Sequence, residues 1–220
     1  MVSSCRYTSL SEPRLSQELA RLARAKSVAD TDCVSFQPCL LPSAANQDRY
    51  VVEDWPLPAG TWSFRAVFDG NCCILCPVRL AAHWMSLGHA GHETVDFACE
   101  RLPAMLRNNL VACLRQPNID LVSAVPDVLR QSIAAFDELI AADLLRLFPD
   151  PNALSHLSDS ELRSIINDKG RNSAAIYRCM SGSTVLLSLL DPARKHLWVA
   201  TLGDSQAGAY QCMVSSAPEA

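Results

Sequence analysis

The order of hydrophobic patterns along the 220-residue chain predicts an α+β fold, in which strands flank a central block of helices. Alternating apolar residues indicate strands before Asp69 and after Ser183, and a helical period occupies much of the stretch between them. Hydrophobic residues make up 49% of the chain and charged residues 19%, so the composition can build a buried core. Strands that follow one another in pairs, with helices grouped between them, favour a sandwich over an alternating parallel sheet.

Composition and charge exclude several classes of protein. The formal net charge is −4 and no block of Lys or Arg stands out, which argues against a dedicated nucleic-acid binder. The apolar runs, such as Val185–Leu190, fall short of the roughly 18 residues that a bilayer-spanning helix needs. Residues 1–10 contain no apolar segment typical of a secretory signal. We therefore expect an intracellular protein with no membrane span and no nucleic-acid partner.

The chain contains 10 cysteines, and their irregular spacing does not match a disulfide-stapled secreted module. Cys99 and Cys113 fall inside helical patterns, where a reduced thiol behaves as a small apolar side chain. We expect reduced thiols and no disulfide framework.

An N-terminal helix or leader is predicted within residues 1–30. The helix covers residues 15–26, with Leu15, Leu19, Leu22 and Ala23 on one face. Its basic residues suit a mitochondrial presequence, but Glu12 and Glu18 dilute them, so a solvated docking helix is the alternative. The compartment, cytoplasmic or mitochondrial, stays open.

Strands are predicted next at residues 31–37, 49–55 and 62–68, with a turn at Pro56–Gly60 between the second and third. From Glu93 the period changes, and a long amphipathic helix is expected with a kink or a break at Pro103. A second long helix is expected to open at Pro126–Asp127 and to close before Pro149–Pro151. Ser158 and Glu161 have the spacing of a capping box ahead of a third helix.

Two further strands are expected at residues 183–190 and 196–202, joined by a turn at Asp191-Pro192. Ser183 and Thr184 suit the start of a strand and belong to no nucleophilic triad that the sequence can place. Asp48, Asp69 and Asp204 each stand at the end of a predicted strand. If these strands are neighbours, their carboxylates can meet at one edge of the sheet and bind hard cations such as Mg²⁺ or Mn²⁺.

Five short segments occur in an order that resembles the metal-dependent serine/threonine protein phosphatases (type 2C, PPM family). The helix-rich part of the chain resembles the pyruvate dehydrogenase phosphatase-like branch of that family. The segments are Asn46–Tyr50, Ala66–Gly70, His89–His92, Ser181–Thr184 and Leu197–Ser205.

The resemblance implies an αββα sandwich with two or more Mg²⁺ or Mn²⁺ ions at one edge of its sheets. It implies that Asp69 bridges two ions, that Gly70 offers its carbonyl, and that Asp48 reaches a metal through water. It implies that Asp204 helps to hold a further ion, and that His89 is the general acid for the leaving alcohol. The implied activity is the hydrolysis of phosphoserine and phosphothreonine in a phosphoprotein substrate.

The chain departs from the family pattern in the segment between Gly70 and His89. The family motif continues directly from one to the other, whereas this chain carries an atypical insert at residues 71–88. The codons possible at its two ends allow splice-site dinucleotides, so we interpret the insert as a retained intron of 18 codons. The alternative is a zinc site made by Cys73, Cys76, His83, His89 and His92, although a single Cys-x-x-Cys pair predicts one only weakly.

Other departures concern the ligands and the extent of the domain. Gln47 stands where the family often has Glu, and Ser43 stands where many members carry a phosphate-binding Arg, a role for which Arg49 is near enough in sequence to compete. Two later Asp ligands of the family do not occur, so residues 31–207 are interpreted as a partial phosphatase domain and residues 208–220 as a disordered end. A truncated, catalytically inactive relative with an interaction role is therefore the alternative function.

Overall fold

The computed structural model describes residues 9–22, 25–35, 47–72, 93–150, 152–167 and 172–210. The chain divides into two compact units, Met1–Asp48 and Arg49–Ala220, and each is described by itself. No helix in the described part of the chain has the length and apolar character needed to cross a membrane.

The first unit holds one helix and one small hairpin. Helix α1 spans Arg14–Leu22, and strand β1 (Lys26–Val28) pairs antiparallel with β2 (Thr31–Cys33). The predicted helix at residues 15–26 is therefore too long, because Lys26 begins a strand. β-Branched residues flank the tight Ala29–Asp30 turn, and the Ser27 hydroxyl donates to Asp32 Oδ1 across it (2.6 Å). The predicted strand at residues 31–37 ends at Cys33, and residues 36–37 lie outside the described part.

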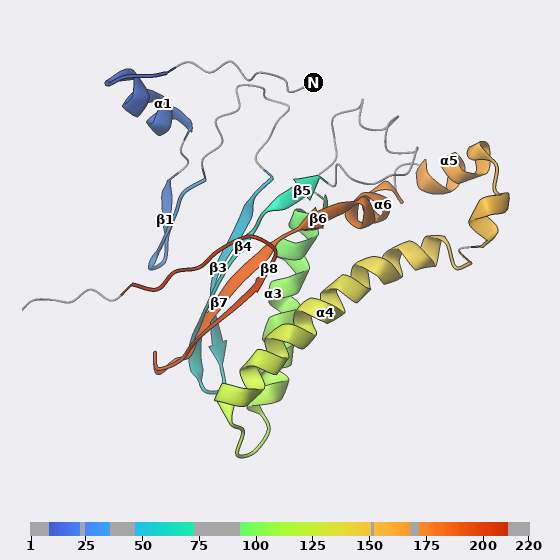
Figure 1. Cartoon of the computed structure of the whole chain (residues 1–220). Coiled ribbons are helices and arrows are strands. Elements are labelled where there is room, and N and C mark those ends of the chain that lie inside the picture. Colours follow the sequence, from blue (N-terminus) through green and yellow to red (C-terminus); the bar gives the residue numbers. More distant parts are fainter. Residues whose placement is uncertain are drawn as a thin grey trace, which may run out of the picture. The chain divides into compact units, whose positions relative to one another are not determined.

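The second unit is built on a four-stranded antiparallel sheet with the order β3-β4-β7-β8 (Figure 1). These strands span Arg49–Leu57, Gly60–Phe68, Val185–Leu190 and Leu197–Leu202. The strands predicted at residues 49–55, 62–68 and 196–202 are confirmed in kind, with small shifts at their ends. The α+β class is confirmed, since the helices separate the two strand pairs in sequence.

Turn chemistry fixes the two hairpins of this sheet. Leu57 pairs with Gly60 around a two-residue turn, and Gly60 has a φ of +118°, which favours glycine. At the β7–β8 connection the buried Asp191 accepts hydrogen bonds from the backbone N–H groups of Lys195 (2.7 Å) and His196 (3.0 Å). Burial raises the pKa of Asp191, but these hydrogen bonds outweigh burial and hold the pKa below its ordinary value of 3.8.

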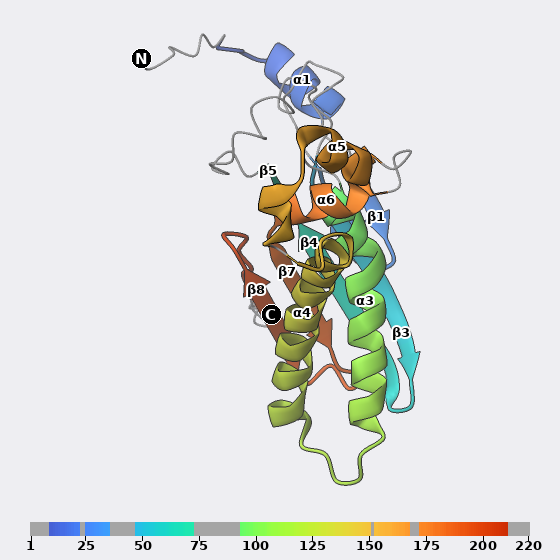
Figure 2. The same cartoon turned by 90° about the vertical axis from the view of Figure 1, so that its right-hand side faces the viewer.

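Two long helices cover one face of the sheet. Helix α3 spans Glu93–Leu114 and α4 spans Leu121–Leu147, and Figure 2 shows them side by side against the strands. The period-2 alternation of the strands turns one set of side chains toward these helices. Apolar residues of the sheet and of both helices form one buried cluster, which includes Trp55, Trp62, Phe64, Phe68, Leu187, Leu189, Leu102, Leu106, Leu110 and Leu129.

The opposite face of the sheet carries the alternate residues of each strand. Val67, Leu197 and Val199 are exposed there, whereas Leu187 and Leu189 on the helix-covered face are buried. In the described part of the second unit, the sheet therefore has a helical layer on one side.

Each long helix contains a proline at which the sequence analysis expects the helix to begin or to be interrupted. Helix α3 continues through Pro103, so of the kink or break predicted there the break is wrong. Helix α4 begins at Leu121 rather than at Pro126, because Asp120 caps it: Asp120 Oδ1 accepts from the Val122 N–H (3.1 Å). Pro126 is then the sixth residue of the helix, where its missing N–H removes one intrahelical hydrogen bond, the one to the Val122 carbonyl.

Short helices connect α4 to the last strands. They are the 3₁₀ helix η2 (Ala153–His156), α5 (Asp159–Asn167) and α6 (Ser173–Met180). The capping box of α5 is confirmed: the Ser158 N–H donates to Glu161 Oε2 (2.8 Å) and the Glu161 N–H donates to the Ser158 hydroxyl (3.3 Å). Helix α6 was not predicted, because its eight residues are too few for a periodic pattern to stand out.

Candidate functional site

The candidate site begins where β4 ends. Asp69 follows β4 directly, and Gly70 starts the short strand β5 (Gly70–Cys72), which pairs with β6 (Ser181–Ser183). The ladder of β4 with β7 and that of β5 with β6 share one register, which places Asp69 opposite Thr184. The predicted strand at residues 183–190 is therefore interrupted at Thr184, and Ser183 belongs to β6.

Of the two hydrogen bonds between Asp69 and Thr184, one has a side-chain oxygen as acceptor in place of a backbone carbonyl. The Thr184 N–H donates to the Asp69 carbonyl (2.9 Å), as in a regular ladder. In the other direction the Asp69 N–H donates to Thr184 Oγ1 at 3.4 Å. The Thr184 carbonyl instead accepts from the Ser183 hydroxyl (2.7 Å). This local exchange of acceptors explains why the regular strand is interrupted beside Asp69.

The Gly203–Ser205 turn reaches the same threonine from β8. The hydroxyl groups of Thr184 and Ser205 lie 2.8 Å apart, and the Thr201 hydroxyl donates to the Ser205 carbonyl (3.1 Å). Gly203 has a φ of +107°, and a Cβ placed on it would lie 2.8 Å from Thr184 Cβ. Thr184 is only 5% exposed, so its hydroxyl is a buried link between the segments that carry Asp69 and Asp204.

Asp48, the third acidic residue predicted for this edge, is the last residue of the first unit. The next residue, Arg49, pairs with Phe68, which precedes Asp69. The Arg49 guanidinium forms an ion pair with Asp96 of α3 (2.8 Å). Arg49 is therefore engaged by a carboxylate on the helix that covers the sheet.

The structure brings together two of the three segments that carry the predicted metal ligands. The segments of Asp69 and Asp204 meet at Thr184. Among the described residues, however, no group of three or more His, Cys, Asp or Glu side chains is arranged to hold a metal ion. His89 lies outside the described residues, as do Cys73, Cys76, His83 and His92 of the zinc alternative.

The structure describes the thiols of four cysteines, and burial affects three of them. Cys33, Cys99, Cys113 and Cys179 are free thiols. Burial raises the pKa of Cys99 to about 11, so its thiol stays protonated at neutral pH. Burial likewise raises the pKa of Cys113 and of Cys179, whose thiol donates to the Ile140 carbonyl at 3.3 Å.

Sequence reasoning missed the linking role of Thr184 and Ser205. The run of small polar residues at 181–184 was a visible signal, since it is unusual at the start of a buried strand. Thr184 could not be placed against Asp69 from the sequence, because the contact joins residues 115 positions apart.

Comparisons with known proteins assign no family to this chain. No protein-family model matches the sequence, and no curated protein matches it either.

Proposed function

We propose that the chain carries part of a metal-dependent phosphoprotein phosphatase that acts on phosphoserine and phosphothreonine. The observation that supports this most directly is the meeting of the Asp69 and Asp204 segments at Thr184. The ordered sequence motifs resemble those of the PPM phosphatase family, whose fold is an αββα sandwich. The described sheet with its helical layer is compatible with half of such a sandwich.

The donor groups at this edge suit hard divalent cations. Asp69 and Asp204 offer carboxylate oxygens and Gly70 offers a backbone carbonyl, which are the ligand types that Mg²⁺ and Mn²⁺ prefer. Asp48 would add a contact through water. Bound there, such ions would supply Lewis-acid activation of a water molecule and of the phosphoryl group.

The remaining roles fall to side chains of this chain. His89 would hand a proton to the departing serine or threonine oxygen, which otherwise leaves as a poor alkoxide. Thr184 would hold the Asp69 backbone and the Gly203–Ser205 turn in place, since its hydroxyl contacts both. Thr184 is thus a positioning residue and touches no substrate in this proposal.

Phosphatase assays with the full chain test this proposal. We expect turnover of p-nitrophenyl phosphate and of a phosphothreonine peptide that depends on millimolar Mn²⁺ or Mg²⁺. Asp69→Asn and Asp204→Asn should each reduce kcat/KM by about 100-fold or more, as expected for lost charge stabilisation of the transition state. Asp127→Asn on the exposed side of α4 is the matched control and should retain activity.

A second function, an inactive phosphatase-like protein with an interaction role, is favoured by the donor count. The described residues offer no three-ligand group, and two direct carboxylates hold Mn²⁺ only weakly. A folded parent chain that neither turns over substrate nor binds Mn²⁺ by calorimetry would establish this alternative and contradict the first.

A further inference from the structure

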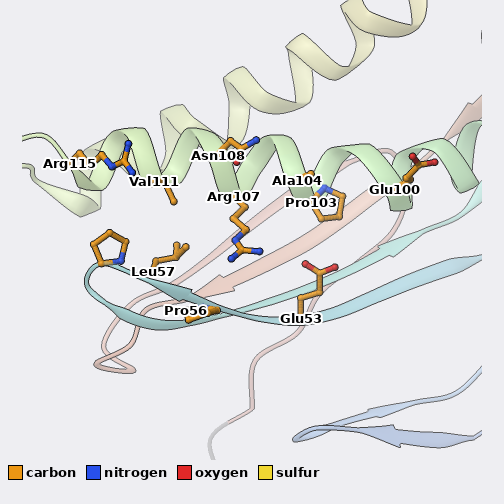
Figure 3. A pocket seen from close by; sticks show the side chains of 11 residues that line it. Glu53, Pro56, Leu57, Glu100, Pro103, Ala104, Arg107, Asn108, Val111 and Arg115 are labelled. Atoms are coloured by element: carbon orange, nitrogen blue, oxygen red, sulfur yellow. The ribbon is translucent and has the colours of Figure 1, made fainter.

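A groove of about 580 Å³ lies between α3 and the β3–β4 hairpin, a size typical of ligand sites. Leu57 of the hairpin and Pro103 and Val111 of the helix form its apolar walls, and Arg107, Arg115, Glu53 and Glu100 carry its charges. Figure 3 shows the Arg107 side chain extending from α3 into the space between helix and hairpin. We call this feature the α3–hairpin groove.

The α3–hairpin groove is separate from the candidate metal edge. The edge lies next to the Arg49 end of β3, whereas the groove lies along Glu53 to Pro58, toward the hairpin turn. A strand rises about 3.3 Å per residue, so Glu53 lies about 13 Å from Arg49 and Leu57 about 26 Å from it.

The guanidinium groups of the two groove arginines have no partner among the described residues. Neither Arg107 nor Arg115 forms a hydrogen bond or an ion pair with any residue that the structure describes. Glu53 accepts a hydrogen bond from Trp55 Nε1 (2.6 Å), and Glu100 lies 3.7 Å from Arg101 Nε, so both carboxylates are turned to partners other than these arginines. The basic charge therefore remains available to a ligand.

Glu100 and Arg107 lie on α3, and Arg115 directly follows its last residue, Leu114. Glu100, Arg107 and Arg115 are separated by seven and eight residues, which corresponds to about 10 Å and about 12 Å at 1.5 Å per residue. An extended peptide covers those distances in about three to four residues, and only residues an even number of positions apart point to the same side. A complementary peptide thus has one basic residue, an acidic residue four positions away and another acidic residue four positions beyond it.

We propose that the α3–hairpin groove binds an extended acidic segment of a partner protein. Guanidinium groups recognise carboxylates through charge-assisted hydrogen bonds, and Arg107 and Arg115 would each bind one acidic side chain. Glu100, whose pair with Arg101 is exposed and long at 3.7 Å, would bind the basic residue, and Leu57, Pro103 and Val111 would pack against apolar side chains between the charges. This inference does not depend on the proposed phosphatase activity.

The probe is the rhodamine-labelled peptide Lys-Thr-Leu-Thr-Glu-Thr-Leu-Thr-Glu, which has this spacing and β-branched residues that favour an extended chain, and binding is followed by fluorescence anisotropy. We expect binding that Arg107→Glu and Arg115→Glu each weaken by tenfold or more, because a hydrogen bond to a charged group is worth at least about 1.4 kcal/mol. Arg163→Glu, on the exposed surface of α5, is the matched control and should bind as the parent does.

A charge-swapped peptide makes the test specific. The peptide with Lys in place of its first Glu should bind the Arg107→Glu chain better than it binds the parent. Equal binding of both peptides to both chains, or the same loss in Arg163→Glu, would overturn the proposal. A dimer that dissociates in Arg107→Glu, seen by sedimentation without peptide, would also overturn it and assign the groove to a second copy of the chain. Circular dichroism establishes that each variant is folded.

Discussion

Thr184 is the residue on which the geometry of the candidate site depends. Its hydroxyl accepts from the Asp69 N–H and lies 2.8 Å from the Ser205 hydroxyl, while its side chain is almost fully buried. A buried polar group with two partners costs free energy when one of those partners, or the group itself, is removed. The residue therefore connects local stability with the placement of the two aspartates.

We expect Thr184→Val, which keeps the shape but removes the hydroxyl, to lower the free energy of unfolding by about 1–2 kcal/mol. Thr184→Ser retains the hydroxyl and should preserve most of the hydrogen bonding. Urea denaturation measures the difference. If the phosphatase proposal holds, the Mn²⁺ concentration for half-maximal activity should rise in Thr184→Val and much less in Thr184→Ser. Equal behaviour of both variants would show that the hydroxyl has no positioning role.

Gly203 offers a second test of the same contact. Gly203→Ala should destabilise the fold by about 1–3 kcal/mol, because the new Cβ meets Thr184 and because φ at +107° is strained for alanine. Gly182→Ala is the matched control, since a Cβ at Gly182 meets no atom within 4 Å. The two urea midpoints decide the matter, and an equal shift in both would contradict the close approach.

For single residues, the sequence indicates which side chains are candidates for the site better than it indicates which of them are in contact. Asp69 and Asp204 could be singled out because each follows a strand and precedes or follows a glycine. Their link through Thr184 could not be predicted, since it depends on which strands pair and in which register. Whether the carboxylates themselves bind metal stays a prediction.

Among the elements, the β7–β8 hairpin depends on Asp191. Its Oδ1 accepts two backbone N–H groups, and its Oδ2 lies 3.2 Å from His196 Nδ1. We expect Asp191→Ala to lower the free energy of unfolding by about 2–3 kcal/mol, because two backbone N–H groups lose a charged acceptor. Asp191→Asn keeps one acceptor oxygen and should have a smaller effect.

The pH dependence of this effect follows from the lowered pKa of Asp191. A carboxyl group whose pKa is lower in the folded state than in the unfolded state stabilises the fold above its unfolded value, here near 3.8. That contribution is lost as the pH falls through the folded value. The stability difference between the parent chain and Asp191→Asn should therefore shrink as the pH falls below about 4. A difference that stays the same or grows as the pH falls from about 4 to about 2 would contradict the lowered pKa.

Proline and capping residues explain where the element predictions are right and wrong. The capping box at Ser158 and Glu161 locates the start of α5 because it depends on four consecutive residues. The start of α4 differs from the prediction because Pro126 resembles a first helical residue, whereas a lone Asp at position 120 is a weak sequence signal for a cap. The strand at Thr31 was predicted, but its partner β1 was not, because β1 has only three residues and lies where the helix was expected to continue.

Among the residues that the structure describes in the second unit, helices cover one face of the sheet and leave the other face open. Leu187→Ala, on the covered face, should cost about 2–5 kcal/mol, since Leu187 is 1% exposed and its removal leaves a cavity. Val199→Ala on the neighbouring strand should cost less than about 1 kcal/mol, because Val199 is 47% exposed. Urea unfolding of the two variants compares the faces directly, and similar losses would mean that the open face is also covered.

The α+β class and most strands of the second unit could be predicted from the spacing of apolar residues and from the order of the elements, because long amphipathic segments show a clear period. How many layers of helix and sheet pack together could not be predicted from the apolar pattern. Which face of a strand is covered depends on partners distant in sequence, and apolar residues occupy both faces of β7.

The two outer strands of the sheet differ in how they meet a further strand. β3 carries Pro56, which lacks a donor, and the charged pair Glu53 and Asp54, features that discourage edge-to-edge pairing. β8, with the sequence Leu-Trp-Val-Ala-Thr-Leu, contains neither proline nor charge. At high protein concentration, self-association and amyloid-like stacking should therefore start from β8, and a lysine introduced on its exposed face should delay both.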